Sequence, residues 1–470
     1  MSTTETTTKA AKASAGGGRA TAIAVNAGRL IVGLTLTVSG YVKAVDPVGT
    51  QLKIHEYMAA AGLGDALPQW QELTAAVTLP AIEFTLGVML LFAIHRKTVA
   101  WASAVFIAMM TAVTVWIAAA DPVSDCGCFG DAIKLSNGQT LAKNILLTAL
   151  CIVICRRPTA MTRLVSAFNQ WIVTNYTVLF IVGTSLWSLY DLPYLDFRPY
   201  HAGANIAEEM AIPEGAEQPQ FLTTFIMEKN GERREFTIDD YPDSTWTFID
   251  SRTVQTSKGY EPAITDFRIE TREGTDVTDS LLGDNNYAFW IVSPHVETAA
   301  DANFGDINRL YEYAQAHGYG FIGLTASGAG AIERWSDITG AEYPFMLMDD
   351  TTLKTMIRSN PGVMLVKGAT IIRKWSHNRL PKDTELGGSL ETSAIGTVPG
   401  DTTAIRILKV VLYYVLPLAI LSAADRWWAR RKQRATPGDN SDSDEANGND
   451  GNDNGKGDMA NDNDKQPANA

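Results

Sequence analysis

Two of the four cysteines in this chain of 470 residues lie one residue apart, in the stretch DCGCFGD that follows a long apolar run. Cys126 and Cys128 can form a disulfide because Gly127 relaxes the backbone of the small ring. A strained, exposed disulfide is oxidising and labile, and so short a loop adds little stability through chain entropy. The pair is therefore typical of a thiol–disulfide relay.

Two alternatives for this pair remain open. Asp125 and Asp131 flank the cysteines, and nearby carboxylates raise the pKa of a thiol. They favour a structural or inert pair unless Lys43 and Lys134 fold over the loop. A metal site is the other alternative, with His55 as the third ligand, although the spacing matches no zinc motif.

The other two cysteines, Cys151 and Cys155, are four residues apart on a predicted helix and share one face. A disulfide at that spacing would distort the helix. Cys155 also lies about 22 Å along the helix from Thr140, too far to reach Cys126. We expect two free cysteines that act as small apolar residues.

The electron acceptor follows from the absence of a thiol relay across the bilayer. Electrons from Cys126 and Cys128 must leave sideways, and a lipid-soluble quinone is the natural acceptor. The chain has no Gly-rich dinucleotide loop and no haem-attachment motif, so we expect no tightly bound cofactor.

Glu83 is the third candidate site residue, about ten residues into an apolar segment and beside Pro80. A lone carboxylate within a membrane is costly, so such residues usually face the bundle interior and serve function. Glu83 is either a proton relay to the quinone or a protonated side chain that hydrogen-bonds a neighbouring helix. Arg29 is a candidate partner, and a small-molecule carrier that uses Glu83 is a further alternative.

These residues must be positioned by membrane helices, because several windows of about twenty residues carry almost no charge. The six predicted spans are Ala22–Val42, Leu73–Ile94, Val99–Ala119, Leu141–Cys155, Trp171–Leu189 and Ile407–Ala424. We expect residues 1–20 to be disordered. The first apolar segment then acts as its own insertion signal, since no cleavable signal peptide is evident.

Basic clusters predict how the chain threads. The clusters His95–Lys97, Arg156–Arg163 and Asp425–Arg434 follow the second, fourth and sixth spans, and basic residues mark the cytoplasmic side. The Cys-Gly-Cys loop and residues 191–403 then face the opposite compartment. In a bacterium that compartment is the periplasm, where disulfides persist.

Charge excludes one class of partner. The net charge is −13, which argues against nucleic acid. Much of it lies in residues 439–470, which contain nine Asp or Glu against two Lys. This low-complexity acidic sequence cannot form a core, and residues 426–470 are expected to be a disordered cytoplasmic tail.

Residues 191–403 are too polar for a membrane and predict an α/β domain. A hairpin is expected over FLTTFIMEKNGERREFTI, turning at Asn230-Gly231. Strands then alternate with helices from NYAFWIVS to YPFMLMDD and TTLKTMIRSN, and a closing hairpin turns at Lys367-Gly368. This order predicts a mixed sheet with helices packed on it.

The order of elements over residues 286–376 resembles the thioredoxin-like fold, with Pro361 at the position of the family's cis-proline. Thioredoxins carry Cys-x-x-Cys after the strand that matches AFWIVS, whereas this chain has Ser293 and His295 there. No cysteine lies in residues 191–403, so this domain cannot exchange disulfides. We expect a binding or docking module; a Ser–His nucleophile and base is the alternative.

The first four spans resemble the DoxX and MauE membrane proteins in three stretches: SGYVKAVDPVGTQLKIHEYM, LPAIEFTLGVMLL and DCGCFGD. The resemblance implies a redox-associated bacterial membrane protein. For MauE-like members it implies support of disulfide formation or of the maturation of periplasmic enzymes.

The expected fold is a multi-pass α-helical membrane bundle with an α/β, thioredoxin-like extracytoplasmic domain. Residues 21–157 form the DoxX/MauE-like four-helix core, 158–190 a cytoplasmic linker and fifth span, 191–403 the periplasmic domain, and 404–425 the sixth span. The expected function is a relay at the bacterial inner membrane between a periplasmic client protein and the quinone pool, through Cys126 and Cys128. A non-enzymatic scaffold or maturation accessory, whose α/β domain binds a partner, is the alternative.

Overall fold

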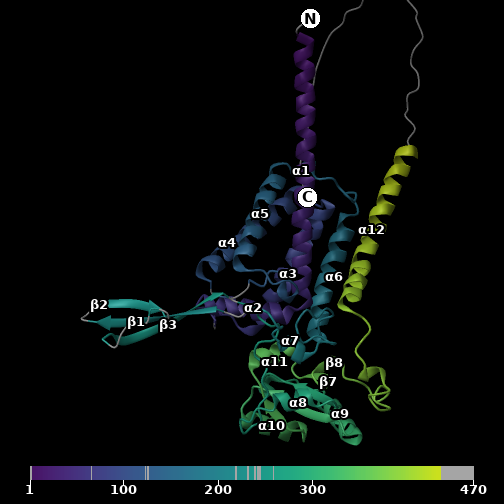
Figure 1. Ribbon diagram of the computed structural model, residues 1–470. Helices are drawn as coiled ribbons and strands as arrows, with labels where there is room; N and C mark the ends of the chain where they lie inside the picture. Colours follow the sequence, from purple (N-terminus) through teal and green to yellow (C-terminus); the bar gives the residue numbers. More distant parts are fainter. Residues whose placement is uncertain are drawn as a thin grey trace, which may run out of the picture. The chain divides into compact units, whose positions relative to one another are not determined.

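The computed structural model describes residues 3–435, apart from residues 65, 122, 124–125, 218–219, 230–231, 238–239, 241–244 and 258. Among these residues, six helices are long and apolar enough to cross a membrane (Figure 1). They are α1 (Thr3–Val45), α3 (Gln69–Phe92), α4 (Arg96–Ala120), α5 (Asn137–Arg156), α6 (Gln170–Tyr190) and α12 (Thr403–Ala435). The chain is thus a multi-pass membrane protein with a separate α/β region.

Two bounds differ from the prediction. Helix α1 begins at Thr3, within the residues expected to be disordered. Ala and Lys favour helix, and extending a helix that has already nucleated is far easier than starting one. Helix α12 continues to Ala435, beyond the predicted span; the rest of the acidic tail lies outside the described residues.

Glycines bring α1 and α3 into backbone contact. A Cβ added at Gly40 would lie 2.5 Å from the backbone nitrogen of Phe84, and one added at Gly87 would lie 2.6 Å from that of Thr37. Membrane helices associate through such small residues, since apolar burial alone does not favour a helix over lipid. The glycines fix the register of the two helices and place Glu83 beside the last turn of α1.

The basic loops lie at one end of the bundle, as the threading predicts. Arg96 at the start of α4 donates to the carbonyl of Met161 in the α5–α6 connection, at 2.9 Å. Asp425 of α12 accepts a hydrogen bond of 2.8 Å from the hydroxyl of Ser166 in the same connection.

At the other end, α2 (Pro47–Ala60) follows α1 directly. Asp46 caps it by accepting from the backbone N–H of Gly49, at 2.9 Å, and Pro47 occupies its first turn. The side chain of Gln51 donates to the carbonyl of Gln69, so α2 packs on the start of α3. The sequence patterns missed α2 because it lies between two apolar windows.

The α/β region contains a five-stranded sheet in the order β6-β5-β4-β7-β8. Strands β4 (Tyr287–Val292), β5 (Gly320–Thr325) and β6 (Phe345–Leu347) are parallel. Strand β7 (Gly362–Lys367) runs antiparallel to β4, and β8 (Thr370–Ser376) runs antiparallel to β7. These strands and the turn at Gly368, with φ +57°, confirm the predicted alternation and closing hairpin.

Both faces of this sheet are buried. Phe289 and Ile291 of β4 pack with α9 (Phe304–His317) and α10 (Ala329–Thr339). Trp290 and Val292 face the other side, with α7 (Ile206–Met210) and α11 (Asp350–Met356). Helix α8 (Thr278–Gly283) precedes β4. Alternate residues of a central strand therefore serve two cores.

A second sheet has the order β2-β1-β3. The predicted hairpin is confirmed as the antiparallel pair β1 (Gln220–Lys229) and β2 (Glu232–Thr237), although its turn at residues 230–231 lies outside the described residues. Strand β3 (Thr247–Ser257) pairs with the other edge of β1 and was not predicted.

Candidate functional site

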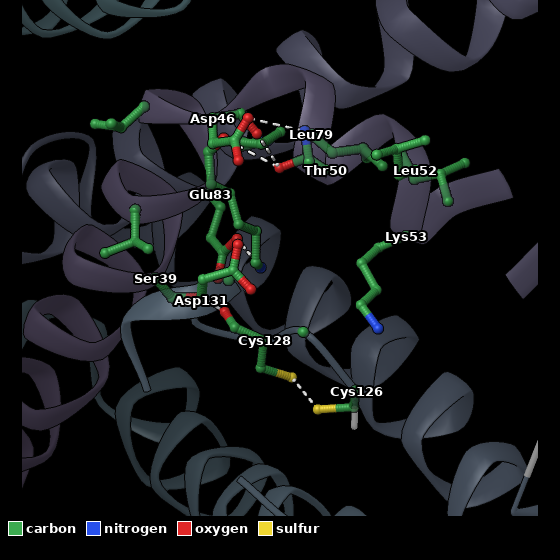
Figure 2. Close-up of a pocket in the computed structure, with 18 of the residues that line it drawn as sticks. Ser39, Asp46, Thr50, Leu52, Lys53, Leu79, Glu83, Cys126, Cys128 and Asp131 are labelled. Atoms are coloured by element: carbon green, nitrogen blue, oxygen red, sulfur yellow. Dashed lines mark hydrogen bonds and ion pairs between the residues drawn. The ribbon is translucent and has the colours of Figure 1, made fainter. Parts of the chain in front are cut away.

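A cavity of about 760 Å³ lies where helices α1–α5 meet the α/β region, and Cys126, Cys128 and Glu83 all line it. Figure 2 shows them around this space. The three site residues that the sequence singled out are thus brought together. The inner wall is apolar, formed by Leu36, Phe106, Ile107, Met110, Val113 and Leu147.

The two thiols form a contacting pair of free cysteines. Their Sγ atoms are 3.0 Å apart and point toward one another (Figure 2). The hydroxyl oxygen of Thr140 is also 3.0 Å from Cys126 Sγ. Gly127 between them has φ +54°, a left-handed conformation that only glycine adopts without strain. This turn directs both side chains to the same side of the loop.

The loop is held by hydroxyl groups of two other helices. Ser39 of α1 donates to the carbonyl of Cys128 at 2.7 Å. Tyr57 of α2 donates to the carbonyl of Cys126. Such fixed anchors keep the thiols in one geometry, which reactive sites require.

The environment separates the two thiols in acidity. The hydrogen bonds that Cys126 shares with Cys128 and Thr140 outweigh burial and lower the pKa of Cys126 to about 6, and the charge of Lys143 adds to the shift. The same bond to Cys126, together with burial, raises the pKa of Cys128. One thiolate and one thiol therefore coexist at neutral pH, as in reactive cysteine pairs.

The charges around the pair differ from those expected. Asp125 lies outside the described residues, and Asp131 faces Arg358, with 3.9 Å between Asp131 Oδ2 and Nη2 of the arginine. Lys43 and Lys143, rather than Lys134, supply the positive charge near the thiols. Lys143 was missed because only the fold of the loop against α5 brings it close.

Glu83 accepts a hydrogen bond from Lys43 of the neighbouring helix α1 and forms an ion pair with it. Its Oε2 lies 2.7 Å from Nζ of Lys43, and both side chains are largely buried, with 7% and 16% of their surface exposed. Arg29, the expected candidate, instead donates to the carbonyl of Thr162 at 2.7 Å. Glu83 lies beside the last turn of α1, which carries Lys43.

The metal alternative loses its third ligand. Nδ1 of His55 lies 3.0 Å from Glu72 on α3, so the imidazole pairs with a carboxylate rather than with the thiols. Within the described part of the chain, no group of three His, Cys, Asp or Glu side chains is arranged to hold a metal ion.

The other candidate residues from the sequence lie outside this cavity: Cys151, Cys155, Ser293 and His295. Cys151 is buried and Cys155 half-buried among apolar side chains, with the Cys155 thiol donating to the carbonyl of Ala100, so both are free cysteines as predicted. Ser293 donates to Asn360 Oδ1 at 2.6 Å, whereas His295 pairs with Asp350 at 3.0 Å. The Ser–His alternative therefore lacks the contact that a nucleophile and its base need.

Two protein-family models match separate parts of the chain, one in the membrane helices and one in the α/β region. Residues 21–157 match the family model of methylamine utilisation protein MauE. This MauE-like segment contains α2–α5, most of α1, both site cysteines and the ion pair of Lys43 and Glu83. Residues 221–258 match a domain of unknown function, DUF8463, which coincides with the three-stranded sheet. No curated protein and no solved structure matches the chain.

Proposed function

We propose that this protein is a thiol–disulfide relay of the bacterial inner membrane, passing electrons from a periplasmic client protein to the quinone pool. The observation that carries the proposal is the pair of contacting thiols, one with a pKa of about 6, at the edge of an apolar cavity between membrane helices. Stabilising the thiolate stabilises the reduced pair, which makes its disulfide the stronger oxidant.

The relay has two balanced steps. In the first, a client dithiol reduces the Cys126–Cys128 disulfide: the client gains a disulfide, and the relay gains two thiols. In the second, the two thiols become a disulfide again and release two electrons and two protons, which a quinone takes up as it is reduced to quinol.

The cavity suits a lipid-soluble acceptor. Its walls include Met109 and Val113, which are exposed on the surface of α4 that would face lipid. A flat apolar ring can therefore enter from the bilayer and approach Cys126. Glu83 and Lys43 form an ionisable pair in the lining of the same cavity, and we assign them the transfer of protons between the thiols and the acceptor.

The α/β region is proposed to be thioredoxin-like and to bind the client. Its support is the order β6-β5-β4-β7-β8, with β4 central, and the position of Pro361 immediately before β7. With Ser293 and His295 after β4, it orients a client without exchanging disulfides itself.

One observation favours the alternative of a non-enzymatic scaffold: Cys126 is only 7% exposed. The redox states of the cysteines in intact cells decide between the two. We expect Cys126 and Cys128 to shift to the free-thiol form when quinone is depleted, measured by a mass-tagged maleimide, while Cys151 keeps its state. Thiols that never change state would leave only the scaffold.

A further inference from the structure

Arg358 links the α/β region to the membrane bundle. It follows α11, and its side chain is only 6% exposed. Its Nε lies 3.0 Å from each carboxylate oxygen of Asp46, and its Nη2 lies 2.9 Å from Oδ2. Burial would raise the pKa of Asp46, but the charges of Arg358 and Arg198, together with the hydrogen bonds from Arg358 and the backbone of Gly49, outweigh it and lower that pKa. A forked, buried contact of this kind is geometrically specific.

The same guanidinium reaches the cysteine loop. Asp131, the last residue of DCGCFGD, lies 3.9 Å from its Nη2. Burial raises the pKa of Asp131 and the arginine opposes that rise. The loop is thus held from three sides: by Ser39 of α1, by Tyr57 of α2 and by Arg358 of the α/β region.

A second route runs through α2. Asp46 is the N-cap of α2, and Tyr57, on the same helix, donates to the carbonyl of Cys126. By fixing Asp46, Arg358 therefore also fixes the helix that carries one anchor of the loop.

Gly49 provides the space for this contact. A Cβ at Gly49 would lie 2.4 Å from Asp46 Oδ2 and 2.8 Å from Arg358 Nη2. Alanine favours a helix more than glycine does, so Gly49→Ala would strengthen α2 itself while displacing the ion pair. This variant separates the contact from the stability of the helix.

We propose that Arg358 is a positioning residue for the two thiols: the α/β region, through this one side chain, sets the geometry of the Cys-Gly-Cys loop. The structural role of Arg358 does not depend on the proposed function; only its importance for the relay does. Asn360, two residues on, donates to the carbonyl of His295 at 2.9 Å, so the segment that positions the loop also contacts the face proposed to bind the client.

The test is the rate at which a membrane-impermeant maleimide labels Cys126 and Cys128 in the reduced full-length protein in nanodiscs, followed by peptide mass spectrometry across pH. We expect Arg358→Gln and Gly49→Ala to speed labelling at least about tenfold at neutral pH, and Arg358→Lys to recover part of the wild-type rate. Matched controls are Arg379→Gln, which removes an exposed arginine paired with Asp191, and Gly138→Ala, whose added Cβ would meet nothing within 4 Å.

The pH dependence of labelling distinguishes a change in the geometry of the cysteine loop from a mere increase in the solvent exposure of its thiols. Uncovering raises the rate without moving its midpoint. Loss of the loop geometry also breaks the contacts of Cys126 with Cys128 and Thr140, so the midpoint should rise by about one pH unit. Rates within twofold of wild type in Arg358→Gln and Gly49→Ala, or faster labelling with an unmoved midpoint, would overturn the inference. Labelling needs no quinone or client, so this result is independent of whether the relay itself operates.

Discussion

Lys43 Nζ and Glu83 Oε2 lie 2.7 Å apart in the wall of the cavity that also holds the two site cysteines. Neither residue is isolated: one comes from the last turn of α1, the other from the middle of α3. The pair depends on the close approach of these helices at Gly40 and Gly87.

Removing one member of this pair should destabilise the protein more than removing both. Glu83→Gln leaves the ammonium of Lys43 buried without its counter-charge, which should cost about 3–5 kcal/mol of unfolding free energy. The double variant Lys43→Met/Glu83→Leu should recover most of that loss, because no charge remains buried. Thermal unfolding in detergent measures both; additive losses would show that the two side chains do not interact.

The low pKa of the Cys126 thiol depends on neighbouring side chains, so substituting one of them should shift it. With a pKa of about 6, the sulfur is deprotonated above that pH and protonated below it, and alkylation should reach half its maximal rate near pH 6. Thr140→Val removes one hydrogen bond and should move this midpoint up by about one unit. Thr111→Val, which breaks a hydrogen bond to Thr148 elsewhere between α4 and α5, is the control. An identical midpoint in both variants would refute the assigned role of Thr140.

The α/β region carries its own buried charge cluster. Burial would raise the pKa of Asp196, but Lys374 and Arg198 outweigh it and hold that pKa well below its usual range. The stabilisation is therefore present above the unfolded pKa of about 4 and is lost as the pH falls toward the folded value.

Asp196→Asn should cost about 3–5 kcal/mol at neutral pH, because it leaves two cations buried. It should also flatten the decline in melting temperature on acidification. Asp401→Asn breaks an exposed pair with Lys409 and should cost about 1 kcal/mol or less. Equal losses in the two variants would contradict the difference in burial.

The contact between α1 and α3 predicts a steric effect. Gly87→Leu would force a side chain against the backbone of Thr37 and should lower the melting temperature by several degrees, with a loss of about 1–3 kcal/mol. Gly183→Ala on α6, whose Cβ would meet nothing within 4 Å, should not lower it. Equal melting temperatures for both variants would show that the helices separate without cost.

The sequence predicted the candidate site residues better than the residues that contact them. Apolar windows located the spans, and residue type alone singled out Cys126, Cys128 and Glu83. The partner of Glu83 was missed because Lys43 becomes its neighbour only through the register of α1 on α3, which periodicity does not determine. Arg358 was missed because it lies more than 200 residues along the chain from the cysteines and approaches them only through the docking of the α/β region.

The central claim is that the two thiols reduce a quinone, and an anaerobic single-turnover experiment tests it most directly. The full-length protein, reduced and placed in nanodiscs, is mixed with a short-chain ubiquinone, and quinol is counted against free thiols. We predict one quinol per protein with the loss of two thiols, and none from Cys126→Ser or Cys128→Ser. Quinol formation that is absent in the wild type, or equal in the serine variants, would contradict it.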